Sequence, residues 1–225
     1  MPVSTRPPIR SVLFDLDGTL LDTAPDLVWA LNHVREEEGL QALPLERIRP
    51  AVSHGSIALI RHGFECEPEH PRFAARRQRL LDVYRENLAR HTRPFPGMER
   101  LLDELEARGI RWGVVTNKPS WLTEPLLQQL GLLARAAVVV SGDTLAERKP
   151  HPAPILYACR ETGAAPANCL YIGDAERDIR SGRNAGVHTL VALFGYLGPD
   201  DDPRSWGADG LVAKPDEIRD WVVGP

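Results

Sequence analysis

Residues 9–20 read IRSVLFDLDGTL, a mostly apolar run that ends on two aspartates. The run over 9–14 is rich in branched apolar side chains, which predicts a buried strand. Asp15 and Asp17 follow it at once, and residues two apart on an extended chain point to the same side. This stretch therefore predicts a strand whose carboxyl end presents two carboxylates to one place.

Further along the chain, helical and strand patterns alternate. The expected helices cover 98–108, 123–130, 152–162 and 178–185, and the expected strands cover 110–116, 136–140, 169–172 and 188–193. Such alternation is typical of a parallel sheet with helices on both faces. Because a single strand cannot be buried alone, the first strand must join this sheet. We therefore expect an α/β fold built on a doubly wound parallel sheet.

The chain between these two regions shows helical patterns only. The first expected helix opens at Thr23, a residue type that caps helices, and the last ends before a Pro-Phe-Pro-Gly break. We therefore expect an all-helical cap domain over 23–92, inserted into a core domain over 9–22 and 93–225. The cap should lie above the carboxyl ends of the strands, where ligands bind in open α/β sheets.

Composition narrows the class of protein. The chain has 225 residues, of which 43% are apolar and 26% charged, so disordered and collagen-like classes are excluded. A net charge of −4 argues against a nucleic-acid partner, and no run approaches about 20 apolar residues. Cys66, Cys159 and Cys169 lack metal or disulfide-scaffold spacing, which indicates free thiols. We expect a cytoplasmic monomer or weak homodimer that binds a small molecule and no membrane.

Polar side chains follow three of the expected strands. They are Asp15 and Asp17, then Thr116 and Asn117, then Asp174 with Asp178 one helical turn later. Carboxyl ends of parallel strands share one edge of a sheet, so these groups should meet. The carboxylates of Asp15, Asp17 and Asp174, with no histidine or cysteine in the pattern, select Mg²⁺ over zinc, and a phosphate monoester could complete its ligand shell. These three aspartates are therefore candidate metal ligands, and the family resemblance described below adds Asp178 to the metal site.

Lysine is rare in this chain, with only Lys118, Lys149 and Lys214 among 27 basic residues. Lys149 lies in ERKPHP, where two prolines hold the chain extended and set the direction of the lysine. A compact positive charge facing clustered carboxylates would also neutralise transferring phosphoryl oxygens. Together with Thr116 and Asn117, Lys149 is a candidate phosphate-binding residue.

Four segments resemble the motifs of the haloacid dehalogenase-like superfamily and occur in the same order. They are DLDGTL (15–20), VVTNK (114–118), ERKPHP (147–152) and YIGDAERDI (171–179). No position in them departs from the family pattern, and the resemblance extends from Ile9 to Val222. It implies a Rossmann-like core with strand order 5-4-1-2-3, Mg²⁺ dependence and an aspartyl-phosphate intermediate.

The resemblance also implies roles for single residues. Asp15 would be the nucleophile, and Asp17 would protonate the leaving alkoxide and then activate water. Mg²⁺ would bind the carboxylates of Asp15 and Asp174 and the main-chain carbonyl of Asp17. Asp178 would support that shell through water or by orienting Lys149.

Residue identities narrow the choice within the superfamily. Dehalogenases lack the second acid, so Asp17 argues against them, and residues 23–91 contain none of the lysine that a phosphonatase needs. A transport ATPase would need membrane spans. Hydrolysis of a phosphomonoester is then the expected reaction. A sugar-phosphate mutase and a non-enzymatic, phospho-accepting receiver-like module stay open as alternatives.

At a finer level the chain resembles phosphoglycolate phosphatases in residues 15–27 and, more closely, the N-acetylmuramic acid 6-phosphate phosphatases. The segments shared with the latter are IRPAVSHGS (48–56), WGVVTNKP (112–119), EPLLQQLGL (124–132) and SWGAD (205–209). This resemblance implies N-acetylmuramic acid 6-phosphate or 2-phosphoglycolate as the substrate. His54 lies in the cap loop SHGS, where a substrate contact and an ordinary surface position both remain open.

Overall fold

The computed structural model describes residues 8–223, and these form a six-stranded sheet whose paired strands all run parallel. The sheet order is β5-β4-β1-β6-β7-β8. Its strands are β1 (Ser11–Phe14), β4 (Arg111–Val115), β5 (Val138–Val140), β6 (Cys169–Gly173), β7 (His188–Ala192) and β8 (Gly210–Val212). The expected α/β class and the order of the five expected strands are confirmed, whereas the short strand β8 was not expected.

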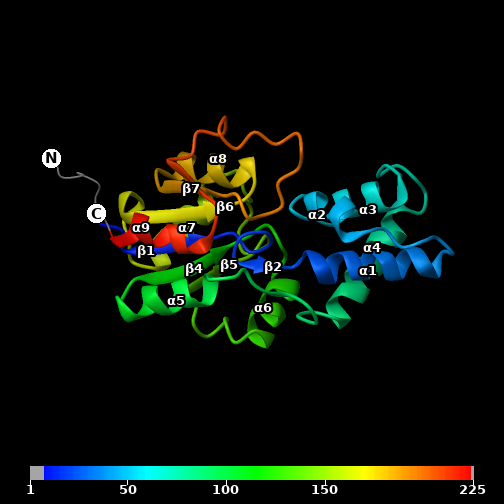
Figure 1. The fold of residues 1–225 in the computed structure, drawn as a ribbon, viewed down its shortest axis with the longest axis horizontal. Coiled ribbons are helices and arrows are strands. Elements are labelled where there is room, and N and C mark those ends of the chain that lie inside the picture. The colour runs from blue at the N-terminus through cyan, green and yellow to red at the C-terminus, as the bar shows by residue number, and fades with distance from the viewer. Residues whose placement is uncertain (1–7, 224–225) are drawn as a thin grey trace.

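Helices cover both faces of the sheet (Figure 1). They are α5 (Met98–Ala107), α6 (Ser120–Gln129), α7 (Ala153–Glu161), α8 (Glu176–Ala185) and the C-terminal α9 (Ile218–Val223). Side chains alternate between the faces along β1: Val12 and Phe14 pack in the cluster that includes α5 and α6, and Leu13 packs in the cluster that includes α7. Burial on both faces explains why these strands read as continuous apolar runs.

The chain between β2 (Leu21–Asp22) and β3 (Arg93–Pro94) forms a separate group of helices, beyond the carboxyl ends of the strands (Figure 1). They are α1 (Ala24–Glu37), α2 (Leu45–Val52), α3 (Gly55–Phe64) and α4 (Phe73–Glu86). The chain leaves through β2 (Leu21–Asp22) and returns through β3 (Arg93–Pro94), and these two short strands pair antiparallel. The helical character expected of this region is confirmed.

Three side chains tie the start of α1 to the rest of the molecule. The carboxylate of Asp26 accepts hydrogen bonds from the backbone N–H groups of His91 and Thr92 at 2.9–3.0 Å and from the Thr92 hydroxyl at 2.7 Å. The Tyr196 hydroxyl accepts from the backbone N–H groups of Thr23 and Ala24 at 2.6 and 2.9 Å. Thr23 does not cap α1 with its side chain, contrary to expectation, because its hydroxyl donates to Asp17 instead, at 2.6 Å.

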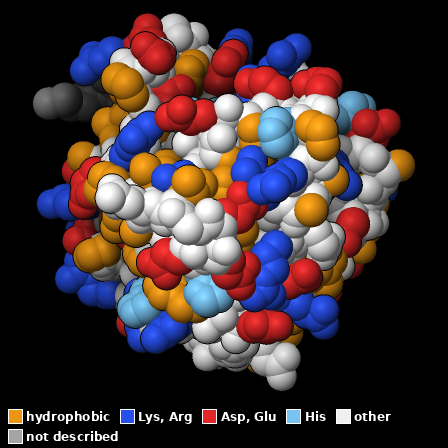
Figure 2. Space-filling model, turned by 90° about the vertical axis from the view of Figure 1, so that its right-hand side faces the viewer, with side chains coloured by type: hydrophobic (Ala, Val, Ile, Leu, Met, Phe, Trp, Pro, Cys, Tyr) orange, Lys and Arg blue, Asp and Glu red, His pale blue; other side chains and the backbone are white. Residues whose placement is uncertain are grey.

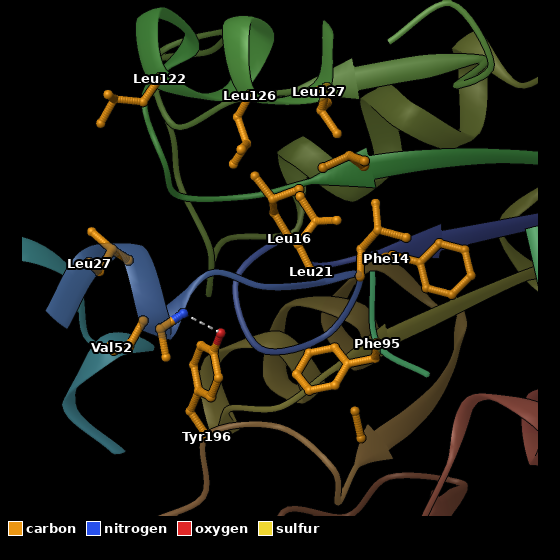
Figure 3. Close-up of a cluster of buried hydrophobic side chains, with 14 of the residues drawn as sticks. Phe14, Leu16, Leu21, Leu27, Val52, Phe95, Leu122, Leu126, Leu127 and Tyr196 are labelled. Carbon is orange, nitrogen blue, oxygen red and sulfur yellow. Dashed lines mark hydrogen bonds between the residues drawn. The ribbon is translucent and has the colours of Figure 1, made fainter. Parts of the chain in front are cut away.

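A continuous apolar cluster joins the sheet to α1–α4. In Figure 3, Leu126 and Leu127 of α6 point toward Leu16 and Leu21. Leu27 and Val52 extend the cluster into α1 and α2. Burial of this apolar surface stabilises the contact between the helices and the sheet.

The outer face of α1–α4 carries acidic and basic side chains interspersed (Figure 2). Arg79 pairs with Glu37 at 2.6 Å and Arg76 pairs with Glu38 at 2.6 Å, which links α4 to the end of α1. The more exposed of the two, Arg79–Glu37, contributes little stability, about 1 kcal/mol or less. This face is therefore a solvated surface.

Within residues 8–223, no helix is long and apolar enough to cross a membrane. Cys66, Cys159 and Cys169 are buried and free, as the sequence indicated. The expected core domain extends to residue 225, and residues 224–225 lie outside the described part of the chain.

Candidate functional site

Three neighbouring strands deliver polar residues to one edge of the sheet. β1 lies between β4 and β6, and Asp15, Thr116 and Asp174 directly follow these strands. All three side chains are buried, with 2–4% exposure. The meeting of these groups that the sequence predicted is confirmed.

Asp15, Asp174 and Asp178 form a buried acidic cluster, with carboxylate oxygens within 4.8 Å of one another. Burial, together with the charges of Asp15 and Asp178, raises the pKa of Asp174 to about 7. Burial likewise raises the pKa of Asp15. Gathering these charges away from water is costly, and a bound cation would offset that cost. The oxygen-only donor set fits a hard divalent cation.

Lys149 connects two members of this cluster. Its Nζ lies 2.8 Å from Oδ1 of both Asp15 and Asp178. It also donates to the Val115 carbonyl and to the Tyr171 hydroxyl, each at 2.9 Å. Burial would raise the pKa of Asp178, but the charges of Lys149 and the nearby Arg177 outweigh it and lower that pKa. Lys149 thus fixes the position of the Asp15 carboxylate through this ion pair.

The loop after β1 passes close to the cluster because it contains Gly18. This residue has a φ of +85°, which favours glycine. A Cβ there would lie 2.3 Å from Oδ2 of Asp174. Any other residue would therefore collide with the carboxylate, so Gly18 sets how closely the Asp15–Asp17 loop approaches Asp174.

Asp17 lies beside the cluster rather than in it. Its carboxylate accepts the Thr23 hydroxyl at 2.6 Å and is paired with Nζ of Lys118 at 2.9 Å. The same Nζ donates to the Tyr84 hydroxyl of α4 at 3.0 Å. Burial would lower the pKa of Lys118, but Asp17 and Tyr84 outweigh it and raise that pKa, and burial raises the pKa of Tyr84 to about 12. Lys118 therefore joins Asp17 to the helical region.

Thr116 and Asn117 shape the neighbouring loops. The Thr116 hydroxyl accepts the Lys118 backbone N–H at 3.1 Å. The Asn117 side chain accepts the Lys149 backbone N–H at 3.1 Å and donates to the Lys149 carbonyl at 3.0 Å. Asn117 thus fixes the position of Lys149, a role that the sequence did not predict.

The loop between α2 and α3 reaches the acidic cluster. Ser53 donates its hydroxyl to Oδ2 of Asp174 at 2.6 Å, and Arg177 donates to the Ser53 carbonyl at 2.6 Å. His54, next in the chain, is exposed, and its pKa is lowered by partial burial and by Arg177. Sequence reasoning named His54 but missed Ser53 and Arg177.

A cavity of about 480 Å³ lies between this edge of the sheet and α1–α4. Asp15, Asp17, Thr116, Asn117 and His54 line it, so five of the predicted site residues face one space. Ser53, Tyr84, Lys118 and Arg177, described above, also line the cavity. Of the residues missed, only Lys118 carried a signal in the sequence, because lysine is rare here.

Comparison with known proteins agrees with this geometry. The chain is 43% identical over 211 residues to an N-acetylmuramic acid 6-phosphate phosphatase of Pseudomonas putida, covering 94% of this chain and 95% of the relative. It is 47% identical over 219 residues to a phosphoglycolate phosphatase of Xanthomonas campestris pv. campestris, covering 96% and 97%.

Among solved structures, a predicted phosphoglycolate phosphatase from Haemophilus somnus superposes with a TM-score of 0.83 and 27% identity, covering 95% of this chain and 97% of the other. The family model described as haloacid dehalogenase-like hydrolase matches residues 12–192, which contain Asp15 and the ends of β1, β4 and β6. The chain belongs to the haloacid dehalogenase-like hydrolase family.

Proposed function

We propose that this protein is a Mg²⁺-dependent phosphomonoesterase that acts on a small phosphorylated metabolite through an aspartyl-phosphate intermediate. The convergence of Asp15, which lines the cavity, with the buried Lys149, Asp174 and Asp178 beside it carries this proposal. The names of the relatives support two candidate substrates, N-acetylmuramic acid 6-phosphate and 2-phosphoglycolate. The free cysteines support a reducing, cytoplasmic compartment, where the protein acts as a monomer or weak homodimer.

The carboxylates of Asp15 and Asp174 and the main-chain carbonyl of Asp17 would hold the Mg²⁺, with Asp178 supporting them. When bound, the ion supplies positive charge against the phosphoryl oxygens. The fit of the three buried carboxylates to a hard cation supports this assignment.

The chain's own residues account for both steps. Asp15 attacks phosphorus, which forms an acyl phosphate and breaks the ester P–O bond, and protonated Asp17 gives its proton to the leaving alkoxide. Asp17 then takes a proton from water as the water attacks the acyl phosphate, releasing inorganic phosphate and restoring Asp15. Lys149 orients the nucleophile, and Lys118 and Thr23 hold Asp17 beside it.

The phosphoryl oxygens are bound by cationic and polar groups around the floor of the cavity. We assign this role to Thr116, to the backbone of Asn117, to Lys149 and to Arg177. The Asn117 side chain is already engaged with Lys149, which is why its backbone is assigned here. The charge of Arg177 acts on Asp15, Asp174 and Asp178, which supports its inclusion.

Residues 23–92 act as a cap that excludes water from the reaction. Contacts from Ser53 to Asp174 and from Tyr84 to Lys118 hold it against the core domain, formed by 9–22 and 93–225. The paired β2 and β3 are the connections about which it would move. His54, which lines the cavity from the cap side, is assigned to substrate binding.

Phosphate release tests the proposal. With Mg²⁺ present, the protein should release inorganic phosphate over many turnovers from at least one of the two candidate substrates, and a chelator should abolish release. A mutase would convert substrate without releasing phosphate, and a receiver-like module would accept one phosphoryl group and stop. Absence of multiple-turnover release from any phosphomonoester in a broad screen would refute a phosphatase.

A further inference from the structure

The cavity extends along one face of α4. Arg77, Leu81 and Tyr84 line it, and their spacing of four and three residues places them on one stripe of the helix. Tyr84 marks the catalytic end, since its hydroxyl contacts the lysine that pairs with Asp17. Seven residues of helix correspond to about 10 Å of rise, so Arg77 belongs to the end of the cavity far from the nucleophile.

Arg77 differs from its neighbours in what it contacts. Arg76 and Arg79 each pair with a glutamate at the C-terminal end of α1, whereas Arg77 has no carboxylate partner among residues 8–223. Its Nε donates to the Ser56 hydroxyl at 2.9 Å. A guanidinium carries five N–H donors in a planar fork that matches a carboxylate. Arg77 therefore presents unused donors at a cavity that would hold a ligand.

Apolar side chains accompany Arg77 in the cavity wall. Ile57 and Trp121 are 48% and 38% exposed, and both line the cavity. Leaving large apolar side chains in water is unfavourable, and they are available to pack against the body of a ligand. Arg85 lies over the Trp121 ring at 5.8 Å from its centroid, which links α4 to this wall.

We propose that Arg77, with Ser56, binds a carboxylate on the leaving group of the substrate, while Ile57 and Trp121 pack against that group's body. This proposal rests on the proposed function and deepens it by naming the substrate class, a phosphorylated sugar acid. In 2-phosphoglycolate the carboxyl carbon lies only about 4 Å from phosphorus by ordinary bond lengths, too close to reach Arg77. A hexose 6-phosphate with an acidic ether at C3 spans about 8 Å.

The volume of the cavity agrees with the larger substrate. About 480 Å³ falls within the range typical of sites for ligands larger than a two-carbon acid. Arg77 is thus a specificity-determining residue that binds the carboxylate far from the phosphate. The groups around Asp15 bind the phosphate that both candidate substrates share.

The test compares two sugars that differ only in the acidic ether at C3. N-Acetylmuramic acid 6-phosphate carries it, and N-acetylglucosamine 6-phosphate does not. We expect Arg77→Gln to lower the ratio of their kcat/KM values about tenfold or more, chiefly through KM for the acidic sugar. Arg77→Lys should restore part of that ratio, because it keeps the charge. Arg79→Gln, on the same helix but outside the cavity, is the matched control and should leave the ratio unchanged.

Distinct results separate failure of this inference from failure of the proposed function. An unchanged ratio in a folded Arg77→Gln protein, with folding checked by thermal melting, would overturn the role of Arg77. The role of Arg77 would also be overturned if the wild-type protein released phosphate from 2-phosphoglycolate and p-nitrophenyl phosphate but from neither sugar. In that case the proposed phosphatase activity would still be supported. If no phosphomonoester were hydrolysed at all, the proposed function itself would fall.

Discussion

At the edge of the sheet, the polar side chains of the site are buried and their charges are paired. In the helical region α1–α4, by contrast, several polar side chains near the cavity are exposed to solvent. Lys149 and Asp178 are almost fully buried and paired at 2.8 Å, but His54 and Arg77 are exposed. A reaction needs carboxylates fixed to fractions of an ångström, and buried, paired groups provide that. Selecting a substrate tolerates more freedom, so the exposed side can vary without disturbing the chemistry.

Among substitutions at the edge of the sheet, we expect the largest effect from replacing the nucleophile. Asp15→Asn should lower kcat about a thousandfold or more, because an amide cannot form the acyl phosphate. Single-turnover and steady-state phosphate release would measure the loss. Asp103→Asn, on the outer face of α5, is the control and should keep wild-type activity. Near-normal turnover of the Asp15→Asn protein would show that another residue is the nucleophile.

The acidic cluster should make stability depend on pH. Asp174 has a pKa near 7 when folded against a usual value of 3.8, so folding binds its proton more tightly and the stabilisation disappears as pH rises through this window. Relative to the Asp174→Asn variant, metal-free wild type should lose about 4 kcal/mol of unfolding free energy between pH 4 and 8.

Urea unfolding of both proteins across this pH range measures the difference. The lowered pKa of Asp178 has the opposite effect, but its stabilisation is lost only as pH falls below about 4, outside the window. Saturating Mg²⁺ should reduce the loss, because the cation favours the ionised carboxylates. Parallel stability curves for wild type and variant would contradict the arrangement of the cluster.

Removal of the buried lysine sharpens the same comparison. Lys149→Met should lower the unfolding free energy by about 3 kcal/mol in metal-free buffer, since Asp15 and Asp178 would face each other without their cation. The exposed Lys214→Met is the matched control and should change stability by less than about 0.5 kcal/mol. Equal effects of the two substitutions in urea unfolding would mean that the buried network contributes no stability.

The smallest effect is expected where the cap touches the cluster. Ser53→Ala removes one hydrogen bond to Asp174 and should change kcat/KM about tenfold or less. Ser120→Ala removes a comparable hydroxyl contact, to the exposed Asp143, and should have no effect on activity. A loss for Ser53→Ala as large as that for Asp15→Asn would mean that the cap side contributes directly to the chemistry.

Sequence reasoning predicted the elements whose signals are local. The apolar runs and the residues that follow them predicted β1, β4 and β6 and the acids at their ends. It missed β8, because the three residues Gly210–Val212 are too few to show a period. It placed Thr23 as a helix cap, yet a carboxylate six residues away in the chain competes for its hydroxyl.

The sequence by itself determined the doubly wound sheet and the set of acids at its edge, because strand periodicity and the carboxyl ends of strands are properties of short segments. The sequence also indicated that Lys149 faces these acids, but only the tertiary structure decided which other cations and hydroxyls meet them. Lys118 lies 101 positions from Asp17, Ser53 lies 121 from Asp174, and Arg77 lines the cavity through the face of a helix. Such contacts depend on how the helices pack over the sheet, and no local pattern records that packing.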